Sequence, residues 1–140
     1  MDETEKIRAN AEMVVQQLRP LSKIDFGYNR ESVHWLQDYI ERLRTGENFE
    51  SQKNKFASVF GSFLGECIIQ CYGGKWGKQN GSLGVIFETD NVAFPFNKIR
   101  KQLENGLEDG IGSFFDTIET LFKIPLKSGS PKRLPWWKLW

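Results

Sequence analysis

Hydrophobic residues recur at helical spacing along much of the chain, and the widest apolar face lies in residues 56–76. There the apolar positions follow the i, i+3, i+4, i+7 pattern of a helix that is buried on more than one side. Gly61 and Gly65 lie four residues apart on an adjoining face, where missing side chains let another backbone approach closely, so we expect a second element to pack there. The pattern predicts a central helix, preceded by a lead-in over residues 46–54 and ended by Gly73.

Four further amphipathic segments flank this helix. Residues 2–19 form the first, and Pro20 is expected to end it. Asn29 is the expected cap of the second helix. After the central helix, Asn97 is a candidate cap for a fourth helix and Asp109 for a fifth, and each precedes an apolar stripe.

Between the third and fourth helices the pattern changes from a helical to an alternating one. Asn80-Gly81 is a strong hairpin signal and predicts strands over residues 75–79 and 82–88. A second turn leads to a short third strand over residues 92–94. The sequence therefore predicts a single α+β domain, in which about five helices pack on a three-stranded antiparallel meander.

Composition agrees with one globular domain, which we expect to span residues 1–125. Hydrophobic residues make up 39% of the 140 residues and charged residues 26%. Cys67 and Cys71 share the apolar face one helical turn apart, which predicts buried thiols of a reducing compartment. His34 is the sole histidine, so we expect neither a metal site nor a cofactor. The N-terminus lacks a signal-peptide pattern, and no run is long enough to span a membrane; the expected location is cytoplasmic.

The formal net charge of +1 hides an uneven distribution. Residues 1–122 carry 14 basic and 18 acidic residues, a net charge of −4, whereas residues 126–140 form a basic, Trp-rich tail. This tail either folds back to cap the core, docks on a partner protein, or rests on an anionic membrane surface. Nucleic-acid binding is not expected, because the body is acidic and the basic stretch is short. The candidate contact residues of the tail are Arg133, Trp136, Trp137 and Trp140.

Glu66 is the only charged residue between positions 56 and 72 and lies at the border of the apolar face. It is either a structural carboxylate, bound by a turn or an arginine, or an acid that acts on a ligand. A small hydrolase that uses Glu66 together with Glu88 or Asp90 is an alternative function, although no catalytic sequence motif supports it. A Cys67 nucleophile is disfavoured by its apolar surroundings.

Three short motifs stand out, namely Leu64-Gly65-Glu66, Gly73-Gly74-Lys75-Trp76 and Phe94-Pro95-Phe96. With them, residues 25–122 resemble a bacterial domain family of unknown function. The resemblance implies a bacterial cytoplasmic domain and brings no activity with it. We therefore expect a non-catalytic interaction module, binding a protein partner or a second copy through Glu66, Trp76 and the tail, with a hydrolase and a membrane-surface protein as alternatives.

Overall fold

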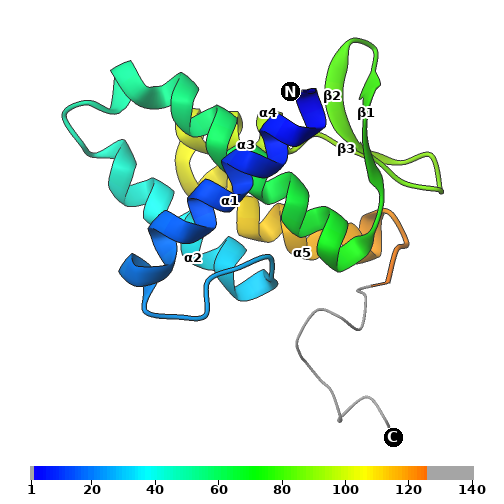
Figure 1. The fold of residues 1–140 in the computed structure, drawn as a ribbon, viewed down its shortest axis with the longest axis horizontal. Helices are drawn as coiled ribbons and strands as arrows, with labels where there is room; N and C mark the ends of the chain where they lie inside the picture. Colours follow the sequence, from blue (N-terminus) through cyan, green and yellow to red (C-terminus); the bar gives the residue numbers. More distant parts are fainter. Residues whose placement is uncertain (1, 126–140) are drawn as a thin grey trace, which may run out of the picture.

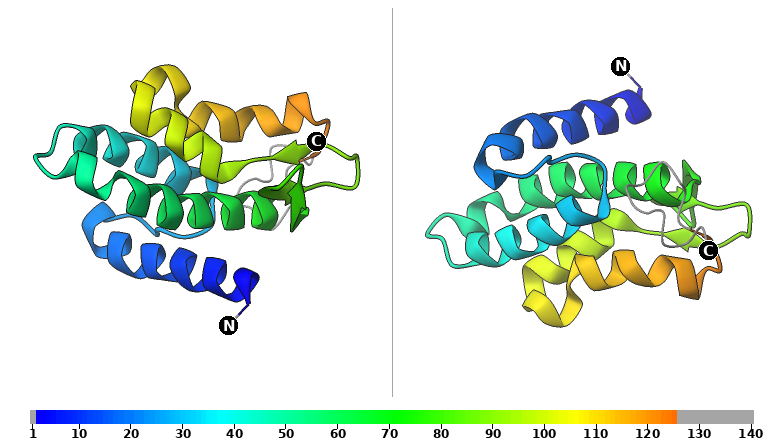
Figure 2. Two further views of the ribbon diagram at one scale, coloured as in Figure 1. Left: turned by 90° about the horizontal axis from the view of Figure 1, so that it is seen from above. Right: turned by 90° about the horizontal axis from the view of Figure 1, so that it is seen from below.

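Helix α3 crosses the middle of the fold, and the other elements pack around it as the sequence predicts (Figure 1). A computed structural model describes residues 2–125, whose elements are α1 (Glu3–Ser22), α2 (Arg30–Arg44), α3 (Phe49–Tyr72), β1 (Lys75–Gln79), β2 (Ser82–Ile86), β3 (Val92–Ala93), α4 (Pro95–Asn105), the 3-10 helix η1 (Gly106–Asp109) and α5 (Ile111–Leu121). Helix α1 lies on one side of the layer formed by α2 and α3, and α4 and α5 lie on the other (Figure 2). This part of the chain forms one α+β domain with five α-helices and a three-stranded antiparallel sheet, which confirms the predicted fold class.

Helix α1 begins as the sequence predicts and ends later. The Asp2 carboxylate accepts a hydrogen bond from the Glu5 N–H (2.9 Å), and the Glu5 side chain accepts one from the Asp2 N–H (3.0 Å). The prediction that Pro20 ends the helix is wrong, because the helix continues to Ser22. Near a helix end, proline removes only one hydrogen bond, and the Lys23 N–H, at φ 60°, closes the last turn.

The sequence misplaced the first residues of α3 and α4. Helix α3 begins at Phe49, inside the expected lead-in, because the buried Phe49 ring packs against Phe56 with ring centroids 6.5 Å apart. Helix α4 begins at Pro95 instead of being capped by Asn97. Proline suits the first helical position, since its fixed φ matches the helix and its missing N–H has no partner there.

Helix α5 is capped by side chains from other helices, and the prediction of an Asp109 cap is wrong. Asp109 belongs to η1, and α5 begins at Ile111. The Ile111 N–H donates to Gln102 Oε1 (3.0 Å), and the Gly112 N–H donates to Gln37 Oε1 (2.8 Å). Because these acceptors lie 9 and 75 positions away in the sequence, no residue next to the helix start marks it.

The predicted hairpin is confirmed. Asn80 (φ 52°) and Gly81 (φ 82°) both take positive φ, as a two-residue hairpin turn of this type requires. Strand β1 pairs antiparallel with β2, so that Trp76 lies opposite Val85. Strand β2 then pairs with β3 to complete the meander.

The second turn is also present and begins earlier than predicted. The Asp90 N–H donates to the Phe87 carbonyl (2.9 Å), and the Phe87 N–H donates to the Asn91 carbonyl (2.9 Å). These bonds end β2 at Ile86 instead of at residue 88. As a result, Glu88 leaves the sheet and becomes exposed.

Two glycines of α3 make room for aromatic rings. A Cβ atom at Gly61 would collide with the Phe96 ring, and one at Gly65 would collide with the Trp76 ring. The two rings contact each other, with centroids 5.7 Å apart. The close approach on this face is therefore made by aromatic side chains of β1 and α4, in place of the backbone that the sequence suggested, and it holds the sheet and α4 against the central helix.

Candidate functional site

The structure brings Glu66 and Trp76 together. Trp76 Nε1 donates a hydrogen bond of 2.8 Å to Glu66 Oε2, and the carboxylate-bearing side chain is only 8% exposed. The indole ring lies directly over Gly65, which has no side chain to block it. The donor to the Glu66 carboxylate is thus an indole, in place of the turn or arginine that the sequence suggested. Its bond fixes the orientation of the Trp76 ring.

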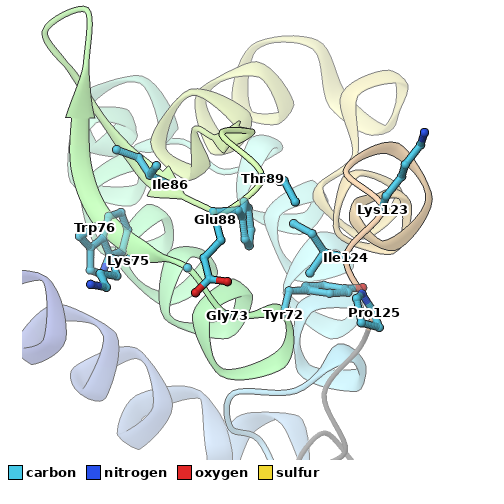
Figure 3. A pocket seen from close by; sticks show the side chains of 12 residues that line it. Tyr72, Gly73, Lys75, Trp76, Ile86, Glu88, Thr89, Lys123, Ile124 and Pro125 are labelled. Atoms are coloured by element: carbon cyan, nitrogen blue, oxygen red, sulfur yellow. The ribbon is translucent and has the colours of Figure 1, made fainter.

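Trp76 also lines a cavity of about 660 Å³, which we name the Trp76 pocket (Figure 3). It lies where α3 ends, between the β-hairpin and the residues that follow α5. Three chain segments form its wall: Tyr72, Gly73, Gly74, Lys75 and Trp76; Ile86, Phe87, Glu88 and Thr89; and Lys123, Ile124 and Pro125.

The inner wall of the Trp76 pocket is apolar. Tyr72, Phe87 and Ile124 are all buried. The Tyr72 hydroxyl donates to the Phe115 carbonyl (3.0 Å), which satisfies its polar group. Burial raises the pKa of Tyr72, and the nearby Asp116 carboxylate raises it further, so the phenol stays neutral over the physiological pH range.

Three charged residues line the pocket, namely the acidic Glu88 and the basic Lys75 and Lys123. The Glu88 carboxylate lies over the middle of the opening, whereas the Lys123 ammonium points away from it (Figure 3). Within residues 2–125, the Glu88 side chain has no hydrogen bond or ion pair. The pocket therefore combines an apolar inner wall with two lysines and one carboxylate that has no partner within the described residues. This carboxylate suits an apolar or aromatic group beside a cation.

A pair of glycines allows the chain to build this pocket. Gly73 (φ 97°) and Gly74 (φ 95°) both have positive φ, which L side chains rarely adopt. A Cβ atom at Gly74 would also lie only 2.7 Å from the Val85 side chain. The Gly73-Gly74 turn is what lets β1 fold back and place Trp76 on α3.

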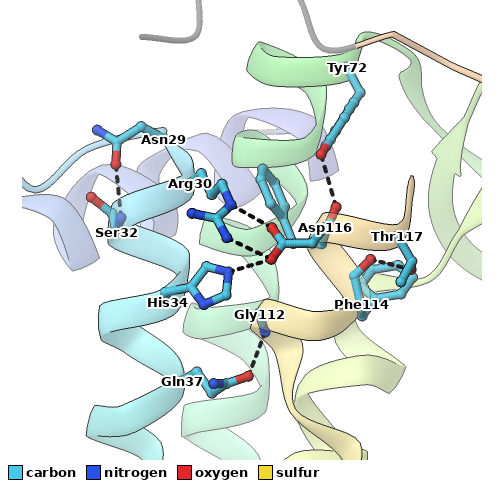
Figure 4. Close-up of polar contacts among 11 residues, drawn as sticks. Asn29, Arg30, Ser32, His34, Gln37, Tyr72, Gly112, Phe114, Asp116 and Thr117 are labelled. Carbon is cyan, nitrogen blue, oxygen red and sulfur yellow. Dashed lines mark hydrogen bonds and ion pairs between the residues drawn. The ribbon is translucent and has the colours of Figure 1, made fainter. Parts of the chain in front are cut away.

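A second polar cluster joins α2 to α5 on another face (Figure 4). Arg30 Nε lies 2.8 Å from Asp116 Oδ1, and Arg30 Nη2 lies 3.0 Å from Oδ2. His34 Nε2 lies 2.9 Å from the same Oδ2. From the sequence, His34 served only to argue against a metal site, and Asp116 was not identified as its partner because the two are 82 positions apart. Since Arg30 already holds both carboxylate oxygens, we regard this cluster as a clamp between two helices.

Burial disfavours the thiolate that Cys67 would need to act as a nucleophile. Its side chain is fully buried, which raises the pKa of its thiol well above the ordinary value. Cys71 is also buried, as predicted, and its sulfur lies 3.7 Å from the Tyr28 carbonyl. A thiolate nucleophile is therefore not available at Cys67.

The remaining predicted site residues lie outside the described part of the chain. These are Arg133, Trp136, Trp137 and Trp140. Among residues 2–125, no three His, Cys, Asp or Glu side chains gather as a metal site would require. No helix in the described range combines the length and hydrophobicity needed to cross a membrane.

The sequence missed most of the pocket because its wall comes from three separate segments. Tyr72, Phe87 and Ile124 each look like ordinary core residues in their own segment. The only local signal was the Gly73-Gly74 pair before Trp76.

No protein-family model matches the chain, and comparisons with curated proteins and with solved structures find no significant match. The resemblance to a bacterial domain family over residues 25–122 therefore stays a prediction. A function can therefore be inferred only from the residues of the site.

Proposed function

We propose that this protein is a non-catalytic interaction module of the bacterial cytoplasm, which binds a segment of a protein partner in the Trp76 pocket. The observation that supports it is an apolar cavity whose mouth holds the unpaired carboxylate of Glu88. The segment that fits carries an aromatic or large apolar side chain next to a lysine or arginine.

The size of the cavity suits such a side chain. At about 660 Å³ the pocket falls in the range of roughly 300–1,000 Å³ that is typical of ligand sites. An aromatic side chain buries about 150–250 Å², which at about 25 cal/mol per Å² contributes roughly 4–6 kcal/mol before the costs of immobilisation. A salt bridge to the exposed Glu88 adds at most about 1 kcal/mol and mainly selects cationic partners.

The Glu66–Trp76 bond supports binding over hydrolysis. Glu66 does not line the pocket, and within residues 2–125 the donor to its carboxylate is the indole that does. Holding the ring in place pre-organises one wall of the pocket, which lowers the entropic cost of binding.

Site-specific photo-crosslinking tests the proposal. A benzophenone amino acid replaces Thr89, at the pocket mouth, or Gln52, an exposed α3 residue outside the pocket, and each protein is irradiated in lysate of the source cells. We expect cross-links from position 89 alone, mapped by mass spectrometry to a segment with an aromatic residue and a cation. Glu88→Lys should weaken them several-fold, because it replaces a weak attraction by a repulsion, whereas Glu108→Lys, the same charge change on η1, should leave them unchanged.

Two results would contradict the proposal. One is an equal pattern of cross-links from positions 89 and 52. The other is a pattern from position 89 whose intensity is unchanged by Glu88→Lys, since the pocket would then not select its ligand by charge.

A further inference from the structure

We infer that the chain carries its own ligand for the Trp76 pocket, namely residues 131–140, so that an external partner must compete with this segment. The inference rests on the proposed function, because it names the first occupant of the same pocket. Three features support it: where the described chain ends, the reach of the residues that follow, and the match in chemistry.

The described chain ends on the rim of the pocket. Ile124 and Pro125, the last described residues, are both lining residues. Ten residues, 126–135, separate this rim from Trp136. Fully extended they span about 33–36 Å, and as a flexible linker they have a root-mean-square length of about 16–19 Å. Both lengths exceed what a turn back into the adjacent cavity requires.

The chemistry of the segment matches the pocket. Residues 126–140 contain four cations and no acidic residue, and three indoles lie in the last five positions. An indole matches the apolar wall formed by Tyr72 and Phe87, and the neighbouring cations match the unpaired Glu88 carboxylate. This is the aromatic-plus-cation pattern that the pocket selects.

Tethering makes even weak docking effective. A short flexible linker gives an effective concentration of about 1 mM. A segment with an intrinsic Kd of about 0.1 mM would then occupy the pocket about 90% of the time and would weaken the apparent affinity of a partner about tenfold. A partner must therefore bind the pocket tightly enough to displace the tail.

Fluorine NMR of the full chain tests this inference. The protein is labelled with 5-fluorotryptophan, its five tryptophan resonances are assigned by single Trp→Phe changes, and a labelled synthetic peptide of residues 126–140 gives the free positions. We expect at least one of the resonances of Trp136, Trp137 and Trp140 to be displaced from its free position. Glu88→Lys should return it to that position, whereas Glu108→Lys should not.

Trp35 reports on folding in the same spectrum. It packs against Phe26, with ring centroids 5.7 Å apart, and does not line the pocket. An unchanged Trp35 resonance shows that Glu88→Lys leaves the fold intact. Changing Lys132 and Arg133 to Glu in the Glu88→Lys protein should restore the displaced tail resonance by reversing both charges.

The outcomes that overturn the inference are distinct. Tail resonances at the free positions in the wild-type chain overturn it, whether or not anionic vesicles later displace them. Displacement that disappears on tenfold dilution also overturns it, because the tail would then occupy the pocket of a second copy. If the tail is free and a partner still cross-links at position 89, only this inference fails; if neither occupies the pocket, the proposed function fails as well.

Discussion

The carboxylate of Glu66 is tolerated inside the helix layer because the Trp76 indole donates to it. We expect Trp76→Phe to lower the free energy of unfolding by about 1–3 kcal/mol beyond the loss of packing, since a buried acceptor then lacks its donor. Urea denaturation of Trp76→Phe, Glu66→Leu and the double variant measures the coupling. We expect the double variant to be more stable than additivity predicts, and strict additivity would show that the bond has no structural role.

Three buried or half-buried groups make the folded state sensitive to alkali. Burial is the main cause that raises the pKa values of Tyr28, Cys67 and Tyr72 above their values of 10.0, 9.0 and 10.0 in unfolded chains. The folded state therefore holds these protons more tightly than the unfolded chain does. Their contribution to the free energy of unfolding is full below about pH 8 and falls above that pH, where the unfolded chain begins to lose them.

Urea denaturation between about pH 8 and pH 11 should show this decline in the free energy of unfolding. Tyr28→Phe should make the decline shallower, because one of the titrating groups is removed. An equal slope in the wild type and in this variant would contradict the assignment.

At the scale of elements, alanine substitutions at two glycines with similar φ distinguish the cost of a steric clash from the cost of a strained backbone. Gly74 (φ 95°) and Gly81 (φ 82°) both disfavour a side chain, but a Cβ atom at Gly81 would meet nothing within 4 Å, whereas one at Gly74 would meet Val85 at 2.7 Å. Gly81→Ala should cost about 1–2 kcal/mol and Gly74→Ala clearly more, measured by thermal or urea unfolding. Equal losses would mean that the α3–β1 turn relaxes without strain.

Helix α5 makes one set of polar contacts with a buried side chain, Gln102, and another with an exposed one, Arg30. Gln102 is fully buried, donates to the Gln37 carbonyl and to Glu41 (2.9 Å each), and accepts from Ile111, so Gln102→Leu should cost about 3 kcal/mol or more. Asp116→Asn should cost less than about 1 kcal/mol, because the side chain of its partner Arg30 is 60% exposed. Urea midpoints rank the two variants, and the reverse order would show that the exposed clamp dominates.

At the scale of the whole molecule, the acidic body and the basic tail are parts of one charge pattern. Residues 1–122 carry a net charge of −4, and the tail supplies compensating cations. If the tail docks as inferred, trypsin should cleave after Arg133 several-fold more slowly in the wild type than in Glu88→Lys. Mass spectrometry of a time course measures both rates, and Glu108→Lys is the matched control. Equal rates in all three proteins would contradict docking.

Local patterns were sufficient for most of the fold. Helical periodicity located the five helices, and Asn80-Gly81 fixed the hairpin, because both depend on neighbouring residues alone. The predicted first residue of a helix was wrong where that start depends on contacts in the folded core and not on the residues next to it. Helix α5 starts where Gln102 and Gln37 accept its first N–H bonds, and α3 starts where Phe49 enters the core.

The candidate site was only partly predictable for the same reason. Glu66 and Trp76 stood out in the sequence, since one is an isolated charge in an apolar run and the other follows a glycine pair. That they bind each other, and that Glu88 stands unpaired beside an apolar cavity, follows only from the packing of α3, the hairpin and the residues after α5. The sequence by itself determined the elements and the charge of the tail, because these depend on residue type and spacing. Tertiary structure alone decided where a pocket forms, because its walls come from segments that are distant in the chain.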